Sequence, residues 1–331
     1  MELELPIEIL IGSFMSFTSD VREELCKKTI NNTHCRVAEI AALISSCSDI
    51  IISIDNEYQL VFKTDTNITA QRFVDLVAKT FKITPQITQK DNQLSRTKHT
   101  FFVTIDNDED TRKVLRRINI VDKNDEMREN LSVNHNEIIE RDCCKRAYLR
   151  GAFIANGSVS DPNKDYHLEI NCPTEDKATQ IKNLMAAFGI ASNILNRKDN
   201  FMVYIKEGEG IGDFLKVIGA SVAVMELENI RILKDMSNYY NRQTNCDAAN
   251  IKKTVTTARR QIDNIQYIID EVGIDYLPDK LQHIAQMRLD NPEMSLQELG
   301  ESMNPPLGKS GVNHRLRKIN EIAEKLRNEE V

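Results

Sequence analysis

The sequence predicts an α+β protein with two domains. In the first, called the saddle below, one α-β-β-α-β-β-α unit occurs twice with pseudo-two-fold symmetry. The second is an all-α helix-turn-helix domain. Three observations predict this class. Alternating helix and strand patterns repeat in the same order over the first 220 residues. Each repeat begins with a helix rich in small residues. After Leu277-Pro278 the strand signals stop and short, capped helices follow.

These patterns divide the chain into four parts. Met15 is a natural start, because Ser19 is placed to cap a helix that begins at Val21. Residues 1–14 are therefore expected to be a non-native or disordered extension. We expect the saddle at 15–220, with repeats 15–120 and 139–220, then a helical linker at 221–276 and the helix-turn-helix domain at 277–331.

The first repeat contains β-branched and aromatic segments between turn signals such as Asp55-Asn56, flanked by amphipathic helices. Its expected elements are a helix at Cys35–Ser46, strands at Ile50–Ile54 and Tyr58–Lys63, a helix at Thr69–Phe81, strands at Ile83–Thr88 and Thr100–Ile105, and a helix at Glu109–Ile118.

The second repeat follows the same order, and in both repeats the middle helix ends in Phe before a strand. Its expected elements are a helix at Cys143–Ala155, strands at Gly157–Ser160 and Tyr166–Asn171, a helix at Glu175–Phe188, strands at Ile190–Asn196 and Phe201–Ile205, and a helix at Gly210–Ile218.

Composition indicates an ordinary soluble globular protein, with 331 residues, 41% hydrophobic and 28% charged. The net charge of −7 does not indicate a nucleic-acid binder, but cations gather at 234–260 and 309–327, where a polyanion site is expected. Seven cysteines without Cys-x-x-Cys spacing are typical of reduced cytosolic thiols, so we expect no metal and no cofactor. No apolar run approaches the ~20 residues that span a bilayer, and the acidic N-terminus argues against secretion. We therefore expect a cytoplasmic protein.

The segment from Tyr148 to Gly157 resembles a LAGLIDADG helix, in which small residues let two helices pack closely and a penultimate acid holds a divalent cation. Leu149, Gly151 and Gly157 match that motif, but Asn156 occupies the position of the acid. An amide keeps the shape of a carboxylate without its charge, and is a poor ligand for Mg²⁺.

The matching helix of the first repeat contains Ala41, Ala42, Ser45 and Ser46, and Cys47 occupies its acid position. The resemblance therefore implies a nuclease fold without nuclease chemistry. Asp49 and Asp161 are possible displaced metal ligands, although both are interpreted as turn residues.

Residues 219–270 carry no strand signal and are expected to be helical. One apolar face is marked by Met225, Ile230, Leu233 and Met236, and Asn245 or Asp247 could cap a second helix. That second helix would bury Ile251, Val255, Ala258, Ile262, Ile265 and Ile269. Its outer face is either an ordinary solvated surface or a second DNA surface, formed by Lys252, Lys253, Arg259 and Arg260.

The C-terminal segment predicts a helix-turn-helix. Leu281, Ile284, Ala285 and Leu289 form an apolar stripe, and Ser295-Leu296-Gln297-Glu298 is a capping box. A Pro- and Gly-rich break follows, and Ser310 is then expected to cap a last helix through Leu326. The inward face of this helix holds Val312, Leu316, Ile319, Ala323 and Leu326.

The outward face of the last helix is cationic and contains an amide. Arg can bond guanine and Asn adenine in the major groove, while Lys and Ser can hold phosphates. The alternative is an amphipathic surface helix with no ligand. The candidate DNA-binding residues are Ser295, Lys309, Ser310, Asn313, His314, Arg315, Arg317 and Lys318.

The whole set of motifs resembles the WhiA family of Gram-positive bacterial regulators. The resemblance covers the chain from about Met15 to its end. It depends on four segments: Met15–Val21, Cys144–Phe153, Asn245–Asn250 and Lys309–Lys318. It implies a degenerate homing-endonuclease-like domain joined to a helix-turn-helix, which binds double-stranded DNA without cleaving it.

The functions implied by the resemblance are regulation of transcription, for sporulation in some relatives, and nucleoid-associated work in cell division and chromosome segregation. Two alternatives remain open. The saddle could be a platform for proteins such as RNA polymerase or the division machinery. A working endonuclease or maturase would instead need carboxylates at the motif positions.

Overall fold

The computed structural model describes residues 16–91, 99–122, 137–197 and 200–329. The expected extension at 1–14 and Met15 lie outside these residues. The chain divides into two compact units, residues 1–234 and 235–331. Within the described residues, no helix is both long enough and apolar enough to cross a bilayer.

The first repeat of unit 1 has the predicted order of elements. After α1 (Phe17–Lys27), it consists of α2 (Thr33–Cys47), β1 (Ser48–Ile52), β2 (Tyr58–Thr64), α3 (Asn67–Phe81), β3 (Gln86–Asp91), β4 (His99–Ile105) and α4 (Asp108–Arg117).

A short 3-10 helix, η3 (Glu137–Ile139), precedes the second repeat. That repeat consists of α5 (Asp142–Asn156), β5 (Gly157–Val159), β6 (Leu168–Cys172), α6 (Glu175–Ala186), β7 (Asn193–Arg197), β8 (Asn200–Ile205) and α7 (Gly208–Ile218).

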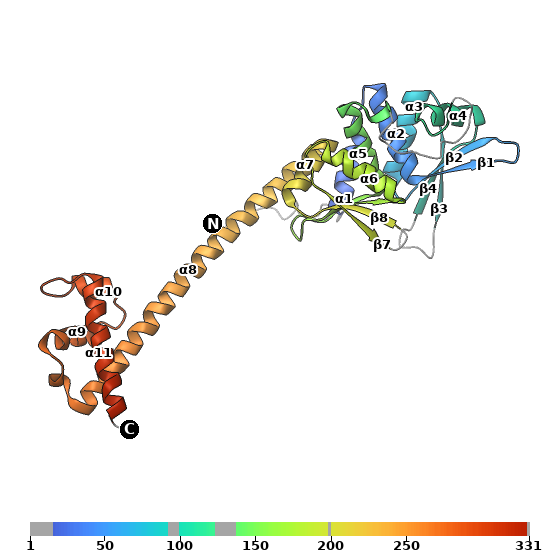
Figure 1. Cartoon of the computed structure of the whole chain (residues 1–331). Helices are drawn as coiled ribbons and strands as arrows, with labels where there is room; N and C mark the ends of the chain where they lie inside the picture. The colour runs from blue at the N-terminus through green and yellow to red at the C-terminus, as the bar shows by residue number, and fades with distance from the viewer. Residues whose placement is uncertain (1–15, 92–98, 123–136, 198–199, 330–331) are drawn as a thin grey trace. The chain divides into compact units, whose positions relative to one another are not determined.

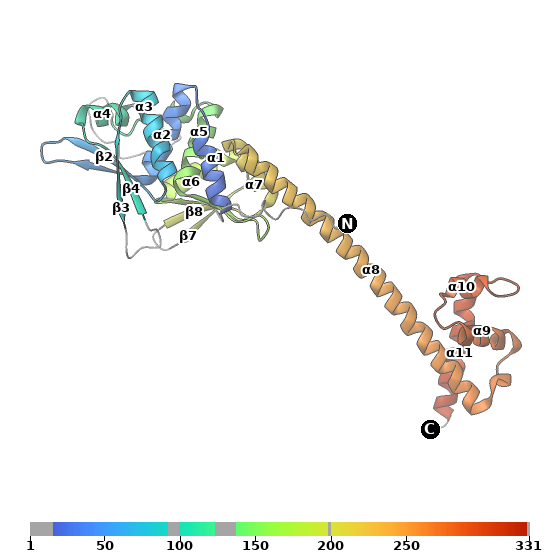
Figure 2. The same ribbon diagram turned by 180° about the vertical axis from the view of Figure 1, so that it is seen from behind.

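The two sheets share one topology, as the pseudo-two-fold prediction requires. Their strand orders are β1-β2-β4-β3 and β5-β6-β8-β7, and every neighbouring pair is antiparallel. Helices α2, α3, α5 and α6 lie on one side of the sheets in both views (Figures 1 and 2). The predicted α+β fold is thus confirmed.

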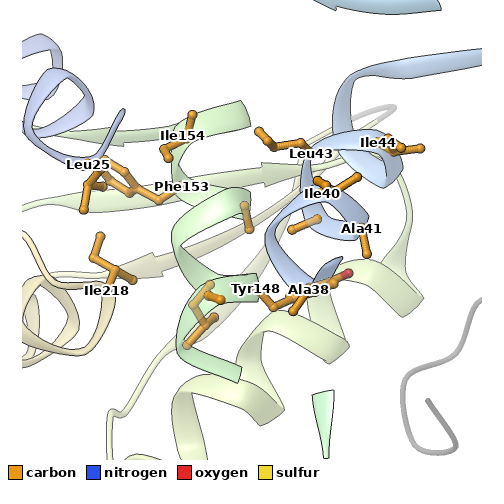
Figure 3. Close-up of a cluster of buried hydrophobic side chains, with 14 of the residues drawn as sticks. Leu25, Ala38, Ile40, Ala41, Leu43, Ile44, Tyr148, Phe153, Ile154 and Ile218 are labelled. Carbon is orange, nitrogen blue, oxygen red and sulfur yellow. The ribbon is translucent and has the colours of Figure 1, made fainter. Parts of the chain in front are cut away.

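The core of unit 1 fills the space between these helices and the sheets. Strand side chains alternate in burial: Leu60 and Phe62 of β2 are buried, whereas Val61 between them is only half-buried. Apolar side chains of α2 and α5 meet along the helix pair, and Leu25 and Ile218 cover the other side of α5 (Figure 3).

Strands β3 and β7 begin three residues later than predicted, because the apolar residues before them belong to the core. Ile83 and Ile190 are buried in the connections that leave α3 and α6. Each connection turns through a left-handed residue, Lys82 (φ 65°) or Gly189 (φ 75°). In each repeat the buried isoleucine therefore precedes the strand along the chain and does not belong to it.

Two predicted helix boundaries are wrong. Ser16 rather than Ser19 caps α1, because the Ser16 side chain accepts from the Ser19 backbone N–H at 3.3 Å. The expected break near Asn245 does not exist, since α8 runs without interruption from Ser221 to Val272. No Gly or Pro lies between Gly219 and Gly273, so nothing in the sequence forces the helix to stop.

The inward residues predicted for α8 are correct only toward its C-terminal end. Ala258 and Ile265 are buried. In contrast, Met225, Leu233, Met236, Ile251 and Val255 are all more than half exposed.

Unit 2 contains the end of α8 and a small helical core. After η4 (Ile274–Tyr276) come α9 (Asp279–Asp290), α10 (Leu296–Glu301) and α11 (Lys309–Glu329). As predicted, Val312, Leu316, Ile319 and Ala323 of α11 are buried, together with Leu299 of α10 and Ile284 of α9. Leu326 packs at the edge of this core.

Candidate functional site

The two motif helices, α2 and α5, lie in backbone contact. A Cβ atom added at Gly151 would lie 2.7 Å from the Glu39 carbonyl oxygen and 2.9 Å from the Ala42 Cβ. Both distances are shorter than a van der Waals contact, so only glycine permits this approach. The small residues of the motif helices predicted this close packing.

A buried ion triad braces the helix pair near Gly151. Glu39 of α2 is fully buried and accepts from Arg72 Nε of α3 at 2.8 Å and from Arg150 Nε of α5 at 2.7 Å. Arg72 also donates to the Lys28 carbonyl, and Arg150 to the Ile218 carbonyl. This triad was not predicted, although an acid inside the otherwise apolar run Val37–Ile44 is a usable signal for a buried ion pair.

The residues at the two acid positions contact each other at the C-terminal ends of the helices. The Cys47 thiol donates to Asn156 Oδ1 at 3.5 Å, and Asn156 Nδ2 donates to the Ser46 carbonyl at 3.3 Å. Burial, with a smaller contribution from the Asp65 charge, raises the pKa of Cys47 to about 12. Both groups are therefore neutral at pH 7. They link the helices by hydrogen bonds, and Asn156 uses a donor that a carboxylate lacks.

A polar groove of about 780 Å³ opens beside these helix ends. Three carboxylates line it: Asp49, Asp65 and Glu169. Arg22 pairs with Asp65 at 3.8 Å, and Ser158 donates to Glu169. These three carboxylates do not lie close enough together to share a metal ion. Among the described residues, the one group of three or more metal-ligand side chains that does so lies away from this groove.

Of the two considered displaced ligands, Asp161 is a turn residue as interpreted, since its carboxylate accepts from the Asn163 backbone N–H at 2.9 Å. Asp49 is not a turn residue. It lies in β1, paired with Val61.

The outward faces of the two sheets are nearly balanced in charge. Residues that pair across strands share a face, so the outward positions can be followed through the register. Among the described strands they contain the cations Lys63, Lys90 and Arg197 and the acids Asp49 and Glu169. Ile51 and Leu195 expose large apolar side chains near the sheet edges.

The predicted capping box is present at the start of α10. The Ser295 side chain accepts from the Glu298 backbone N–H at 3.3 Å, and Glu298 Oε2 accepts from the Ser295 backbone N–H at 2.7 Å. The hydrogen bond that the Ser295 backbone N–H donates lowers the pKa of the Glu298 carboxyl, and the Ser295 side chain adds a smaller contribution. The Ser295 hydroxyl thus already serves the helix terminus.

The turn between α10 and α11 folds tightly back on Gly300. The Leu307 backbone N–H donates to the Gly300 carbonyl at 2.9 Å, and a Cβ at Gly300 would lie 2.1 Å from the Leu307 carbonyl oxygen. Arg288 of α9 is almost fully buried and donates to the Met294 carbonyl at 2.6 Å. Neither role was predicted. Gly300 and Arg288 fix how α10 and α11 follow α9.

Helix α11 begins at Lys309, two residues earlier than predicted, so Ser310 is not its cap. The Gly308 carbonyl accepts from the Gly311 and Val312 backbone N–H groups, which places Ser310 inside the first turn. The outward residues are exposed: Lys309, Ser310, Asn313, His314, Arg317 and Lys318, with Arg315 half-buried beside them. Arg317 Nε donates to Glu321 at 3.1 Å in an exposed pair.

The second cationic group lies on α8. Lys252, Lys253, Arg259 and Arg260 are all exposed. Arg260 is paired with Glu324 of α11 at 3.0 Å, which offsets part of its charge.

These features define a class: a degenerate LAGLIDADG-type saddle, with Cys and Asn at its acid positions, in the same chain as a helix-turn-helix domain. Family comparisons agree along the chain. Residues 33–121 match the WhiA N-terminal LAGLIDADG-like domain, residues 145–237 the WhiA LAGLIDADG-like domain, and residues 240–323 the WhiA C-terminal HTH domain.

Individual relatives are similar over nearly the whole chain. The chain is 42% identical to the "Probable cell division protein WhiA" of Lachnoclostridium phytofermentans, covering 95% of this chain and 100% of the relative. It is 37% identical to the protein of the same name from Clostridium botulinum (strain Hall), covering 95% and 99%. The full-length DUF199/WhiA crystal structure from Thermatoga maritima has a TM-score of 0.58 at 24% identity, covering 94% and 99%. The chain belongs to the WhiA family.

Proposed function

We propose that this protein is a non-enzymatic, double-stranded-DNA-binding regulator that acts in cell division. The observation that carries the proposal is the exposed face of α11, where Asn313, His314, Arg317 and Lys318 stand opposite the buried Val312 and Leu316. Relatives at about 40% identity are named probable cell division proteins, which supports the cellular role. Transcription regulation, chromosome segregation and nucleoid association in the cytoplasm are parts of the same proposal.

The first turn of α11 suits a phosphate. Lys309 and Ser310 are exposed there, next to backbone N–H groups at the positive end of the helix dipole. Arg317 and Asn313 lie one to two turns further along the same exposed face, within the part of a recognition helix that reads base edges. Ser295 and Arg315 would contribute at the margins.

The saddle is proposed not to cleave DNA. Metal-assisted hydrolysis needs carboxylates that hold the cation and activate water. The residues at the acid positions, Cys47 and Asn156, are neutral and hydrogen-bonded to each other. The carboxylates of the adjacent groove are spread along it instead of converging on one point.

We also propose that the saddle binds a protein partner, because its outward faces carry little net charge. DNA binding depends on cations that displace counterions. On the outward faces of the described strands, three cations against two acids provide little of this attraction. Exposed apolar side chains such as Ile51 and Leu195 suit a protein surface better. The division machinery and RNA polymerase are the candidate classes of partner.

The test compares two cation-to-alanine substitutions on α11 in the full chain. Arg317→Ala is expected to weaken binding to a specific duplex by ~1–3 kcal/mol if Arg317 contacts a base, and to lower the salt slope by about 1 if it contacts a phosphate. Lys325→Ala is the matched control, because Lys325 is an exposed cation two turns further along the helix. Equal affinities for the two variants in a fluorescence-anisotropy titration would remove the first half of α11 from the groove.

A further inference from the structure

The N-terminal ends of the two motif helices bring together one histidine and three cysteines. His34 and Cys35 lie in the first turn of α2, and Cys143 and Cys144 in the first turn of α5. They occupy the second and third positions of two 15-residue helices, so each repeat contributes two ligands at equivalent sites. The four ligand atoms all lie within 4.8 Å of one another.

The histidine-to-sulfur distances in this cluster are close to those of a tetrahedral metal site. His34 Nδ1 lies 3.1 Å from Cys144 Sγ, 3.3 Å from Cys35 Sγ and 3.9 Å from Cys143 Sγ. With Zn–S near 2.3 Å and Zn–N near 2.0 Å, an ideal tetrahedron separates nitrogen from sulfur by about 3.5 Å. The three observed separations differ from that value by less than half an ångström. Small side-chain movements would therefore complete the coordination.

The donor set selects the ion. Thiolate and imidazole ligands favour Zn²⁺ over the hard ions Mg²⁺ and Ca²⁺, which bind oxygen. Three thiolates and one neutral imidazole around Zn²⁺ give a net charge of −1. Two helix N-termini would stabilise this charge. Arg117 and Arg141 line the same pocket as His34 and Cys144, but Glu137 and Glu140 line it too and offset their charge.

We propose that His34, Cys35, Cys143 and Cys144 bind one Zn²⁺, which ties the N-terminal ends of α2 and α5 together. Four protein ligands leave no open position for water, so the site is structural. The helices are already linked at their C-terminal ends through Cys47 and Asn156. The two links are roughly 20 Å apart along the helices, and the soft-metal site lies at the end opposite the motif's acid positions.

No local Cys-and-His spacing marks this site in the sequence, because the two ligand pairs are 109 residues apart. The cluster goes beyond the proposed DNA-binding role, which depends on unit 2 alone. All seven cysteines are free thiols in the structure, so the cluster is available as reduced ligands.

The test measures zinc in the reduced full chain after incubation with zinc sulfate and dialysis, by inductively coupled plasma mass spectrometry. The wild type is expected to retain about one zinc ion per chain, and Cys143→Ser to lose most of it. Cys246→Ser is the matched control, because Cys143 and Cys246 are both exposed but Cys246 lies on α8. Using the exposed ligand avoids the core disturbance that replacement of buried Cys144 would cause.

Cobalt substitution provides a second readout. Co²⁺ in the wild type and in Cys246→Ser should show thiolate-to-metal charge-transfer absorption, which Cys143→Ser weakens. A chelator should lower the midpoint of thermal unfolding for the wild type but not for Cys143→Ser. Zinc retention that is absent in the wild type, or equal in all three proteins, would overturn the proposal. So would a disulfide between two of these cysteines in protein isolated without air.

Discussion

The close approach of α2 and α5 makes Gly151→Ala a sharp test of the saddle core. In an ordinary helix, Gly→Ala stabilises by about 0.5–1 kcal/mol, because alanine has the higher helix propensity. At Gly151 the new methyl group would lie 2.7 Å from the Glu39 carbonyl oxygen and 2.9 Å from the Ala42 Cβ. The Glu39 carbonyl is backbone, and its side chain is held by Arg72 and Arg150, so α2 must move as a whole.

Overpacking of this kind typically costs ~1–3 kcal/mol, so a net loss of up to ~2.5 kcal/mol remains after the propensity gain. For a unit of this size, each kcal/mol lowers the midpoint of thermal unfolding by about 2–4 °C. We therefore expect Gly151→Ala to lower the midpoint of unit 1 by up to about 10 °C, measured by calorimetry on the full chain.

Gly311→Ala is the control for this measurement. Gly311 also lies inside a helix, but a Cβ there would meet nothing closer than 3.6 Å. Its unfolding midpoint should stay the same or rise slightly. A Gly151→Ala protein as stable as Gly311→Ala would refute the backbone contact between the motif helices.

Three further predictions concern the same helix pair and the neighbouring helix α1. Glu39→Ala leaves Arg72 and Arg150 buried without their counter-ion, and should cost ~3–5 kcal/mol in denaturant unfolding; a loss below 1 kcal/mol would contradict the triad. Asn156→Asp removes the donor to the Ser46 carbonyl and should cost ~1–3 kcal/mol at pH 7 without producing Mn²⁺-dependent cleavage, whereas exposed Asn196→Asp should be neutral. Burial raises the pKa of Cys26 and Cys47 from 9.0 to about 12, so their contribution to stability is complete below pH 9 and is lost as the pH rises toward 12. Each thiol should contribute up to ~1.4 kcal/mol per pH unit, and a Cys26→Ala, Cys47→Ala double variant that kept the full alkaline slope would disprove this cause.

Local patterns predicted most of the saddle, because its signals lie within a few residues of each other. Small residues marked both motif helices, and β-branched segments marked the strands that pair in each sheet. The strand starts at Gln86 and Asn193 could not be predicted from the sequence. Ile83 and Ile190 have the β-branched side chains typical of strands, but they are buried in the core before the strands begin. Their role is set by the packing of the whole unit.

The unpredicted features of the site depend on contacts that are distant in sequence. Glu39 meets Arg150 across 111 residues, and His34 meets Cys143 across 109. No periodicity or spacing rule reports such a meeting. The exposed face of α11 was predictable because a single helix sets it, whereas the tight return of Leu307 onto Gly300 depends on three-dimensional closure of the turn.

One gel experiment tests whether this protein binds double-stranded DNA without cutting it. The full chain is titrated onto a duplex with Mn²⁺ present, across a series of salt concentrations. We expect shifted, intact DNA whose binding weakens steeply with salt, because Lys and Arg would contact phosphate. Discrete cleavage products, or no shift at the lowest salt concentration, would contradict this expectation.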